Sequence, residues 1–351
     1  MRRLAAPIAA FAFTLALAAP TLACGGLIGP NGAVNLLRTT TLAGYHDGVE
    51  HYVTAFEFAG GGGAFGSITP LPGIPSSVVK GGDWTLQRLI RETDPQPLFF
   101  AAAGAADSRA EVLQQVRIDA LDITILKGGG AEIGVWAKEH GFSLPPDAPE
   151  VLDFYADRSP IFMAASFDAD AAAARGQAVG DGTPVHLTIP TDNPWVPLRI
   201  LALGKSAAET IQADVYLLTD DRPALLPAPG SLLAEGGLKL AHSDAASAEL
   251  LTDLRTDKGM EWVPRDAWLT KIEIDAAATN LRFDLAIDVS GAGKPSLRDA
   301  GFAPFGPLPA PTSWTPLWVM LLAVVFAVPL GGGWLLAHAA RIGGGGRPLA
   351  S

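Results

Sequence analysis

The sequence predicts an α+β fold: a largely antiparallel, β-rich exported domain with a few short helices, followed by one C-terminal transmembrane helix. Strand-length segments with alternating apolar residues recur through the middle of the 351-residue chain. Helical apolar spacing occurs only in short segments that do not alternate regularly with the strands, as they would in a parallel α/β fold. One long uncharged stretch near the C-terminus supplies the membrane-spanning helix.

The first predicted element is a β-hairpin with strands at residues 36–45 and 49–58. Asp47 and Gly48 between them suit a type I′ turn, because both central residues of that turn need positive φ. Four consecutive glycines at residues 60–63 would end the second strand.

A short helix and a strand region follow the hairpin. Asp83 is the expected N-cap of the helix, which places Leu86, Leu89 and Ile90 on one side. Residues 112–126 alternate in apolar character but change phase near the middle, so they form two strands joined by a tight turn or one strand with a bulge.

Helical spacing returns before the second half of the chain. Ile133, Trp136 and His140 share one helical face, and Gly141 would end that helix. Residues 149–155 make a further helical turn or two. Four strands are then predicted at residues 161–167, 184–189, 196–203 and 211–218.

A Pro/Gly-rich passage within residues 220–243 is either a long loop or a subdomain boundary. Ser243 would cap a helix that carries Leu250, Leu251 and Leu254 on its apolar side. The domain would close with a hairpin made of residues 268–274 and 281–289.

Residues 1–23 have the features of a secretory signal peptide. A positively charged start is followed by an apolar run and by a small-x-small cleavage site that ends at Ala23. Cys24, the only cysteine, would become the first residue of the mature protein and is a candidate for lipidation. Thr21 and Leu22 depart from the usual lipoprotein box, so the alternative is a free thiol in an oxidising compartment.

The C-terminal part reads as a linker, a spanning helix and a short tail. Residues 291–313 are rich in proline and glycine, residues 314–340 form the transmembrane helix, and residues 341–351 are the cytoplasmic tail with its arginines. Within the helix, an uncharged stretch of 24 residues at 317–340 would span about 36 Å, which exceeds a hydrocarbon core of about 30 Å. The exported domain therefore occupies residues 24–290.

The charge balance excludes some partners. Four of the 25 basic residues lie in the terminal segments, whereas all 36 acidic residues lie between them, so the exported part carries 21 basic residues and a net charge of −15. A surface of this sign argues against binding to nucleic acid or anionic lipid, and it is compatible with a divalent cation.

Several short motifs resemble the DUF 2330 family of exported bacterial proteins. The motifs are Cys24-Gly25-Gly26, the runs at 66–73 and 81–86, the helical segments at 136–145 and 151–155, and Pro194-Trp195-Val196-Pro197-Leu198-Arg199. Together they cover roughly residues 24–220.

The resemblance implies a bacterial, exported and often membrane-anchored protein, hence a single-pass protein of the bacterial plasma membrane whose N-terminal domain is extracytoplasmic. It implies no activity, cofactor or catalytic residue, because the family has none assigned. Leu27 and Ile28 stand where many relatives carry aromatic residues and a second cysteine, so the resemblance implies no thiol or metal role for this terminus.

His46 and His51 are the strongest candidates for metal ligands in the sequence. A two-residue turn at Asp47-Gly48 would place both histidines on one face of the hairpin as diagonal neighbours, about 7 to 8 Å apart. Two imidazoles at that separation could converge on zinc, with a third ligand from elsewhere; the alternative is a set of solvated polar groups beside a turn.

Two other sequence patterns could be functional sites or ordinary structural features. Gly61-x-Gly63-x-x-Gly66 matches a dinucleotide fingerprint, but an extended, proline-containing segment follows it where a helix is needed. Trp195 and Arg199 would share one face of a strand at 196–203, either as an exposed ridge for a protein or glycan partner or as a face covered by another layer.

No cofactor is expected, and the sequence contains no hydrolase elbow, zincin helix or phosphate loop. The leading hypothesis is a non-enzymatic binding or interaction module, tethered by the C-terminal helix, with an envelope protein or glycan as partner. One alternative is a metal-dependent envelope hydrolase that uses His46 and His51. Another is a subunit of a membrane complex.

Overall fold

The computed structural model describes residues 26–29, 32–33, 39–56, 66–94, 111–168, 183–234, 237–289 and 295–302. They belong to one compact unit, Met1–Phe302. The predicted signal peptide, Cys24, the transmembrane helix at 314–340 and the tail at 341–351 lie outside the described residues. Within the described part of the chain, no helix is both long enough and apolar enough to cross a membrane.

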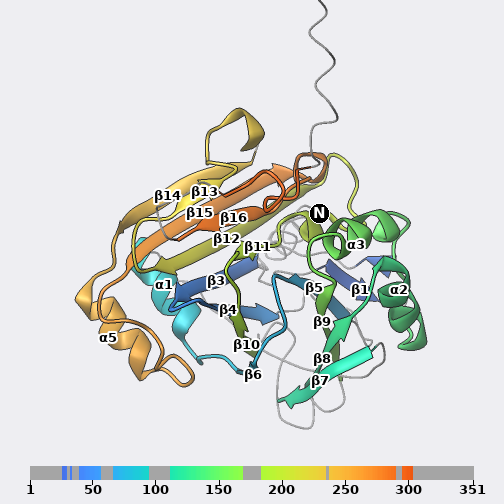
Figure 1. The fold of residues 1–351 in the computed structure, drawn as a ribbon, viewed down its shortest axis with the longest axis horizontal. Coiled ribbons are helices and arrows are strands. Elements are labelled where there is room, and N and C mark those ends of the chain that lie inside the picture. Colours follow the sequence, from blue (N-terminus) through green and yellow to red (C-terminus); the bar gives the residue numbers. More distant parts are fainter. Residues whose placement is uncertain are drawn as a thin grey trace, which may run out of the picture. The chain divides into compact units, whose positions relative to one another are not determined.

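The largest sheet has seven strands and contains the predicted hairpin. Its strands are Thr39–His46 (β3), Val49–Phe56 (β4), Ser77–Lys80 (β6), Thr183–Pro190 (β10), Thr210–Thr219 (β12), Leu238–Ala245 (β14) and Trp268–Ala277 (β15). Their order is β14-β15-β12-β3-β4-β10-β6 (Figure 1). Neighbours are antiparallel except β3 and β12, which run parallel, so this sheet is mixed.

Two further sheets are antiparallel. The six-stranded sheet consists of Gly26–Gly29 (β1), Gly32–Ala33 (β2), Gly66–Leu71 (β5), Glu111–Ile118 (β7), Leu121–Lys127 (β8) and Ile161–Phe167 (β9), in the order β2-β1-β5-β9-β8-β7. The three-stranded sheet consists of Trp195–Val196 (β11), Ala224–Leu226 (β13) and Leu285–Asp288 (β16), in the order β11-β16-β13.

Four short α-helices are described: Thr85–Thr93 (α1), Gly130–Glu139 (α2), Ala148–Ala156 (α3) and Ala248–Thr256 (α5). Short 3₁₀ helices occupy Arg199–Ala202, Leu232–Ala234 and Ala278–Asn280. This content of strands and helices agrees with the predicted α+β class.

Three apolar cores show how the elements are layered. The central core joins one face of each large sheet, with Val215 and Ile272 from one and Met163 from the other. Helices α1 and α5 cover the opposite face of the seven-stranded sheet. Helices α2 and α3 cover the opposite face of the six-stranded sheet, where Trp136 is buried (Figure 1). The layer order is therefore helix, sheet, sheet, helix.

Most strands are buried on both faces because each large sheet is covered on both. All six residues of β5 are buried, as are the first six of β3. This explains why strands such as Thr39–His46 carry small and β-branched residues on both faces instead of a strict apolar and polar alternation.

Several predicted elements are confirmed. The hairpin forms with Asp47 at φ 50° and Gly48 at φ 78°, the two positive values that a type I′ turn requires. A tight turn, at whose first residue Asp119 φ is 54°, separates β7 from β8. Helix α2 ends before Gly141, where φ is 77°. Of the dinucleotide-like motif, Gly66 opens β5 instead of a helix.

The strand predicted at residues 196–203 is wrong. The chain leaves β11 after Val196 and turns into a 3₁₀ helix, because the buried carboxylate of Asp284 accepts hydrogen bonds from the backbone N–H groups of Leu198 and Arg199, at 2.7 and 3.0 Å. Trp195 is buried, with 3% of its surface exposed. It therefore lies on a face that another layer covers, and it does not form an exposed ridge.

Two predicted helix caps are also wrong. The carboxylate of Asp257, not Asp83, accepts hydrogen bonds at the start of α1, from the backbone N–H groups of Asp83 and Trp84, both at 3.0 Å. Ser243 lies in β14, and the hydroxyl oxygen of Ser247 caps α5 by accepting from the N–H of Leu250 at 3.1 Å.

The predicted closing hairpin does not form. Strand β15 pairs with β12 and β14, whereas β16 belongs to the three-stranded sheet. Part of the predicted linker also differs, since residues 295–302 are packed on the domain: Ala300 is buried and Phe302 stacks on Phe283.

Candidate functional site

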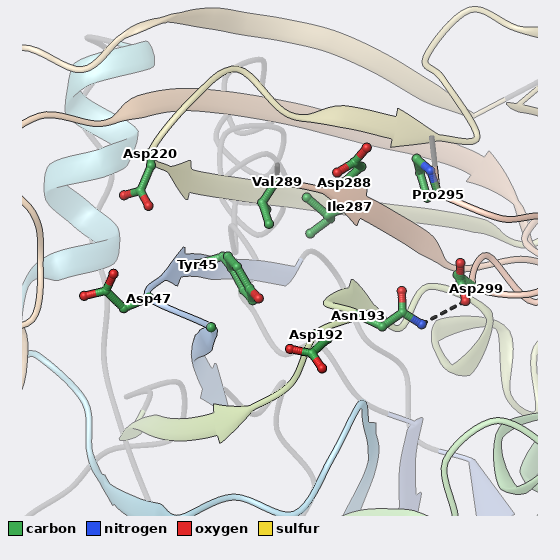
Figure 2. Close-up of a pocket in the computed structure, with 11 residues that line it drawn as sticks. Tyr45, Asp47, Asp192, Asn193, Asp220, Ile287, Asp288, Val289, Pro295 and Asp299 are labelled. Atoms are coloured by element: carbon green, nitrogen blue, oxygen red, sulfur yellow. Dashed lines mark hydrogen bonds between the residues drawn. The ribbon is translucent and has the colours of Figure 1, made fainter. Parts of the chain in front are cut away.

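The candidate site is a pocket of about 530 Å³ at one end of the hairpin. We call it the aspartate pocket because five of its eleven lining residues are aspartates. It is lined by Tyr45, Asp47, Gly48, Asp192, Asn193, Asp220, Ile287, Asp288, Val289, Pro295 and Asp299 (Figure 2).

The hairpin turn forms one wall of the aspartate pocket. Its type I′ geometry projects Asp47 at the rim, and the turn is tied to the next wall by the N–H of Thr191, which donates to the carbonyl of Gly48 at 3.2 Å. The hydroxyl of Tyr45 donates to the carbonyl of Thr191 at 2.9 Å. These bonds fix the Tyr45 side chain as a lining group of the pocket.

The other walls come from four separate parts of the chain. Asp192 and Asn193 follow β10, and Asp220 follows β12. Ile287 and Asp288 belong to β16. Asp299 lies in the packed segment at 295–302, where it accepts a hydrogen bond from the side-chain amide of Asn193 at 2.8 Å (Figure 2).

The charge of the aspartate pocket is strongly negative, because its lining includes five aspartates and no lysine or arginine. Several of these carboxylates have close partners. Asp220 lies 2.6 Å from Nδ1 of His46. Burial opposes ionisation of Asp299, yet hydrogen bonds from Ser296 and Asn193 outweigh it and hold the pKa of Asp299 below its ordinary value.

Glu50 lies on β4 directly across from Tyr45. Its side chain is fully buried, and neither carboxylate oxygen has a hydrogen-bond partner of ordinary geometry in the described structure. Burial raises the pKa of Glu50 to about 8, although the nearby backbone of Trp195 acts to lower it. Burial raises the pKa of Tyr45 too, and the negative charges of Asp192 and Glu50 raise it further.

The two predicted metal ligands share one face but have different partners. The register pairs His46 with Val49 and Gly44 with His51, as expected for diagonal neighbours. His46 contacts Asp220 and Asp47, at 2.6 and 3.4 Å.

His51 instead joins a partly buried aromatic cluster. Its Nδ1 lies 3.0 Å from Nε2 of His186, and its ring stacks on Trp262 with the centroids 3.9 Å apart. Trp262 fits there because Gly44 has no side chain: a Cβ on Gly44 would lie 2.1 Å from the indole. Burial, together with the neighbouring histidines, lowers the pKa of His51 to about 3, and burial lowers the pKa of His186 to about 4.

The described residues contain no group of three or more His, Cys, Asp or Glu side chains arranged to hold a metal ion. A site built on His46 and His51 would therefore need a ligand from outside this part of the chain. The carboxylates of the aspartate pocket are spread around an aromatic and aliphatic wall, and this arrangement suits an organic cation better than a single metal ion.

Most pocket residues were not predicted from the sequence. They come from five separate segments, so no local spacing joins them. One signal was available for Glu50: it is in phase with Tyr52 and Thr54 on the hairpin strand, which puts a carboxyl group on a face that is buried throughout.

The sequence matches the family described as "Uncharacterized protein conserved in bacteria (DUF2330)" over residues 18–287, which is most of the chain. The chain belongs to the DUF2330 family. The resemblance inferred from the motifs is thereby confirmed, and the family description assigns no activity to a DUF2330 protein. None of the curated proteins matches this sequence.

Solved structures of baculovirus P35 show a distant likeness to this DUF2330 protein. A mutated baculovirus P35 after caspase cleavage has 8% identity and a TM-score of 0.38, and the match covers 71% of this chain and 98% of that one. P35 in a caspase-8/P35 complex has 9% identity and a TM-score of 0.37, with 71% and 95% covered. At these TM-scores the likeness carries no argument about fold or function.

Proposed function

We propose that this DUF2330 protein is a non-enzymatic binding module of the bacterial envelope that holds an organic cation in its aspartate pocket. The observation that carries the proposal is the composition of the pocket: five aspartates and no basic residue around a volume of about 530 Å³. A hollow lined by one sign of charge focuses its field and concentrates ligands of the opposite sign.

The apolar lining favours an organic cation over a bare metal ion. The Tyr45 ring, Ile287 and Val289 supply an aromatic and aliphatic surface. Such a surface suits the methylene chain of an amine, and an aromatic face attracts an ammonium group. A bare divalent ion would instead need several oxygen ligands converging on one point.

The placement of the module on the outer face of the plasma membrane is part of the same proposal. Its support is the signal-like segment at residues 1–23 and the long uncharged stretch at 317–340. The acidic surface of the intervening part also agrees with a soluble domain that does not adhere to anionic lipid.

Isothermal titration of the full-length protein in detergent with spermidine, a trivalent organic cation, tests the proposal. We expect binding that weakens as salt is added, since screening reduces attraction between exposed charges. Calcium is the comparison ligand and should bind more weakly than spermidine.

The matched variants remove two negative charges inside or outside the aspartate pocket. Asp47→Asn with Asp192→Asn should weaken spermidine binding by about tenfold or more, which corresponds to at least about 1.4 kcal/mol. Asn at position 47 keeps the turn because it tolerates positive φ. The control pair, Glu139→Gln with Asp266→Asn, changes exposed residues elsewhere and should bind as the wild type does. Equal affinities for the two pairs would refute the assignment of the pocket.

A further inference from the structure

Glu50 is a buried carboxyl group that the packing of the sheet does not explain. Its side chain is 0% exposed, and in the described structure neither oxygen has an ion pair or a hydrogen bond of ordinary geometry, although the backbone of Trp195 interacts with the carboxyl group. Buried acidic residues are nearly always paired, so an exception of this kind points to a functional cause or to a missing ligand.

The position of Glu50 connects it to the aspartate pocket. It does not line the pocket, but Tyr45, its direct cross-strand neighbour, does. Negative charge on Glu50 or on Asp192 raises the pKa of the Tyr45 phenol, so all three groups interact electrostatically. Tyr45 is thus both a lining residue of the pocket and the cross-strand neighbour of the buried carboxyl group.

Among the described residues, none of the groups recorded next to Glu50 carries a positive charge. On β3 it faces Tyr45, and on β10 its partner in the register is Ile189. The backbone of Trp195 lies near it from β11. Asp192, beyond Tyr45, adds a further negative charge. A negative charge on Glu50 is therefore disfavoured until a cation arrives.

We propose that Glu50 is the proton-coupled carboxyl group of the aspartate pocket: it is neutral in the free protein, and it ionises and releases its proton to solvent when an organic cation binds in front of Tyr45. The inference rests on the proposed function. A nearby positive charge stabilises a carboxylate, most strongly where water is excluded. By linkage, conditions that ionise Glu50 must then strengthen binding of the cation.

Titration of full-length protein with spermidine, in buffers of different ionisation enthalpy at pH 6, 7 and 8, measures the protons released. At pH 7 the wild type should release about 0.5 to 1 proton per spermidine. Its affinity should rise roughly five- to fiftyfold between pH 6 and pH 8, as the linkage relation requires for that proton release.

Glu50→Gln keeps the shape of the neutral side chain and cannot ionise. This variant should release no proton from this site, and its affinity should stay near the wild-type value at pH 6. His46→Gln is the matched control, because His46 contacts Asp220 beside the pocket but does not itself line the pocket. His46→Gln should still release the Glu50 proton.

An infrared difference spectrum of wild type against Glu50→Gln provides a readout that does not depend on affinity. At pH 7 the free wild type should show the C=O stretch of a neutral carboxyl group that the variant lacks, and spermidine should abolish it. An ionised Glu50 in the free protein, or equal proton release by wild type and Glu50→Gln, overturns this inference alone. Failure of spermidine to bind at any pH overturns the proposed function and this inference together.

Discussion

Asp284 shows how a single buried residue redirects the chain. Its carboxylate is 0% exposed and accepts hydrogen bonds from the hydroxyl of Tyr155 and from two backbone N–H groups, besides its ion pair with Arg158. Arg158 is itself nearly buried and lies 4.7 Å from the ring of Trp195. Two of the four donors are the backbone N–H groups of Leu198 and Arg199, and these bonds turn the chain out of the extended conformation.

Removal of this carboxylate should be strongly destabilising. Asp284→Ala removes the ion-pair partner of the nearly buried Arg158 guanidinium, for which we expect a loss of about 3 to 5 kcal/mol in the free energy of unfolding. Glu150→Ala is the matched control, because it also removes a carboxylate from an arginine, Arg199, but that carboxylate is 78% exposed. The control should lose no more than about 1 kcal/mol. Urea unfolding curves measure both, and similar losses would contradict the role given to Asp284.

At the scale of elements, the sequence predicted the helices and turns that nearby residues determine. It did not predict those that depend on residues far away in the chain. The hairpin and helix α2 follow from residues that lie within or directly beside them, such as Gly48 and Gly141. The start of α1 depends on Asp257, which is more than 160 residues away in the chain. The 3₁₀ helix after β11 depends in the same way on Asp284. No pattern near residues 83 or 198 reveals these partners.

The type I′ turn requires a positive φ at Gly48, and this requirement can be tested by mutation. Gly48→Ala should lose about 1 to 2 kcal/mol, because φ there is 78° and a side chain disfavours that conformation. The loss is conformational, since an added Cβ meets no atom within 4 Å. Gly134→Ala in α2 should instead gain up to about 1 kcal/mol, because its Cβ makes an ordinary 3.6 Å contact with Leu144. Thermal or urea unfolding of both variants checks the opposite signs.

For the molecule as a whole, the buried titratable groups set opposite limits on stability. His51 and His186 have folded pKa values of about 3 and 4, below the ordinary 6.5, so their contribution is complete above pH 6.5 and is lost as the pH falls towards 3. Glu50 has a folded pKa of about 8, above the ordinary 4.5, so its contribution is complete below pH 4.5 and is lost as the pH rises through 8.

We therefore expect the free energy of unfolding to be greatest near pH 6 and to fall on both sides. Glu50→Gln should remove most of the fall between pH 6 and pH 8, which is on the order of 2 kcal/mol, and it should keep the fall below pH 4.5. His186→Gln should change the acid side only. Urea midpoints measured from pH 4 to pH 9 test this, and an unchanged alkaline side in Glu50→Gln would show that the carboxyl group is already ionised.

The aspartate pocket depends on the fold of the whole domain, because its residues come from distant parts of the chain. The sequence therefore predicted little of it. Asp47 and Asp192 approach each other only because β10 pairs with β4, and Asp299 joins them through a segment that was expected to be a linker. His46 and His51 were singled out from local spacing, and their shared face is confirmed. Their partners, Asp220 and His186, lie more than 130 residues away in the chain.

The parallel pairing of β3 with β12 has a consequence for biosynthesis. One edge of β3 can pair at once with β4, but the other must wait for Thr210–Thr219, which a ribosome adding 5 to 20 residues per second delivers roughly 10 to 30 s later. During that interval the nascent chain carries an open strand edge, the surface on which misassembly begins. A chaperone that covers this edge until residue 219 has been synthesised would prevent misassembly of the nascent chain.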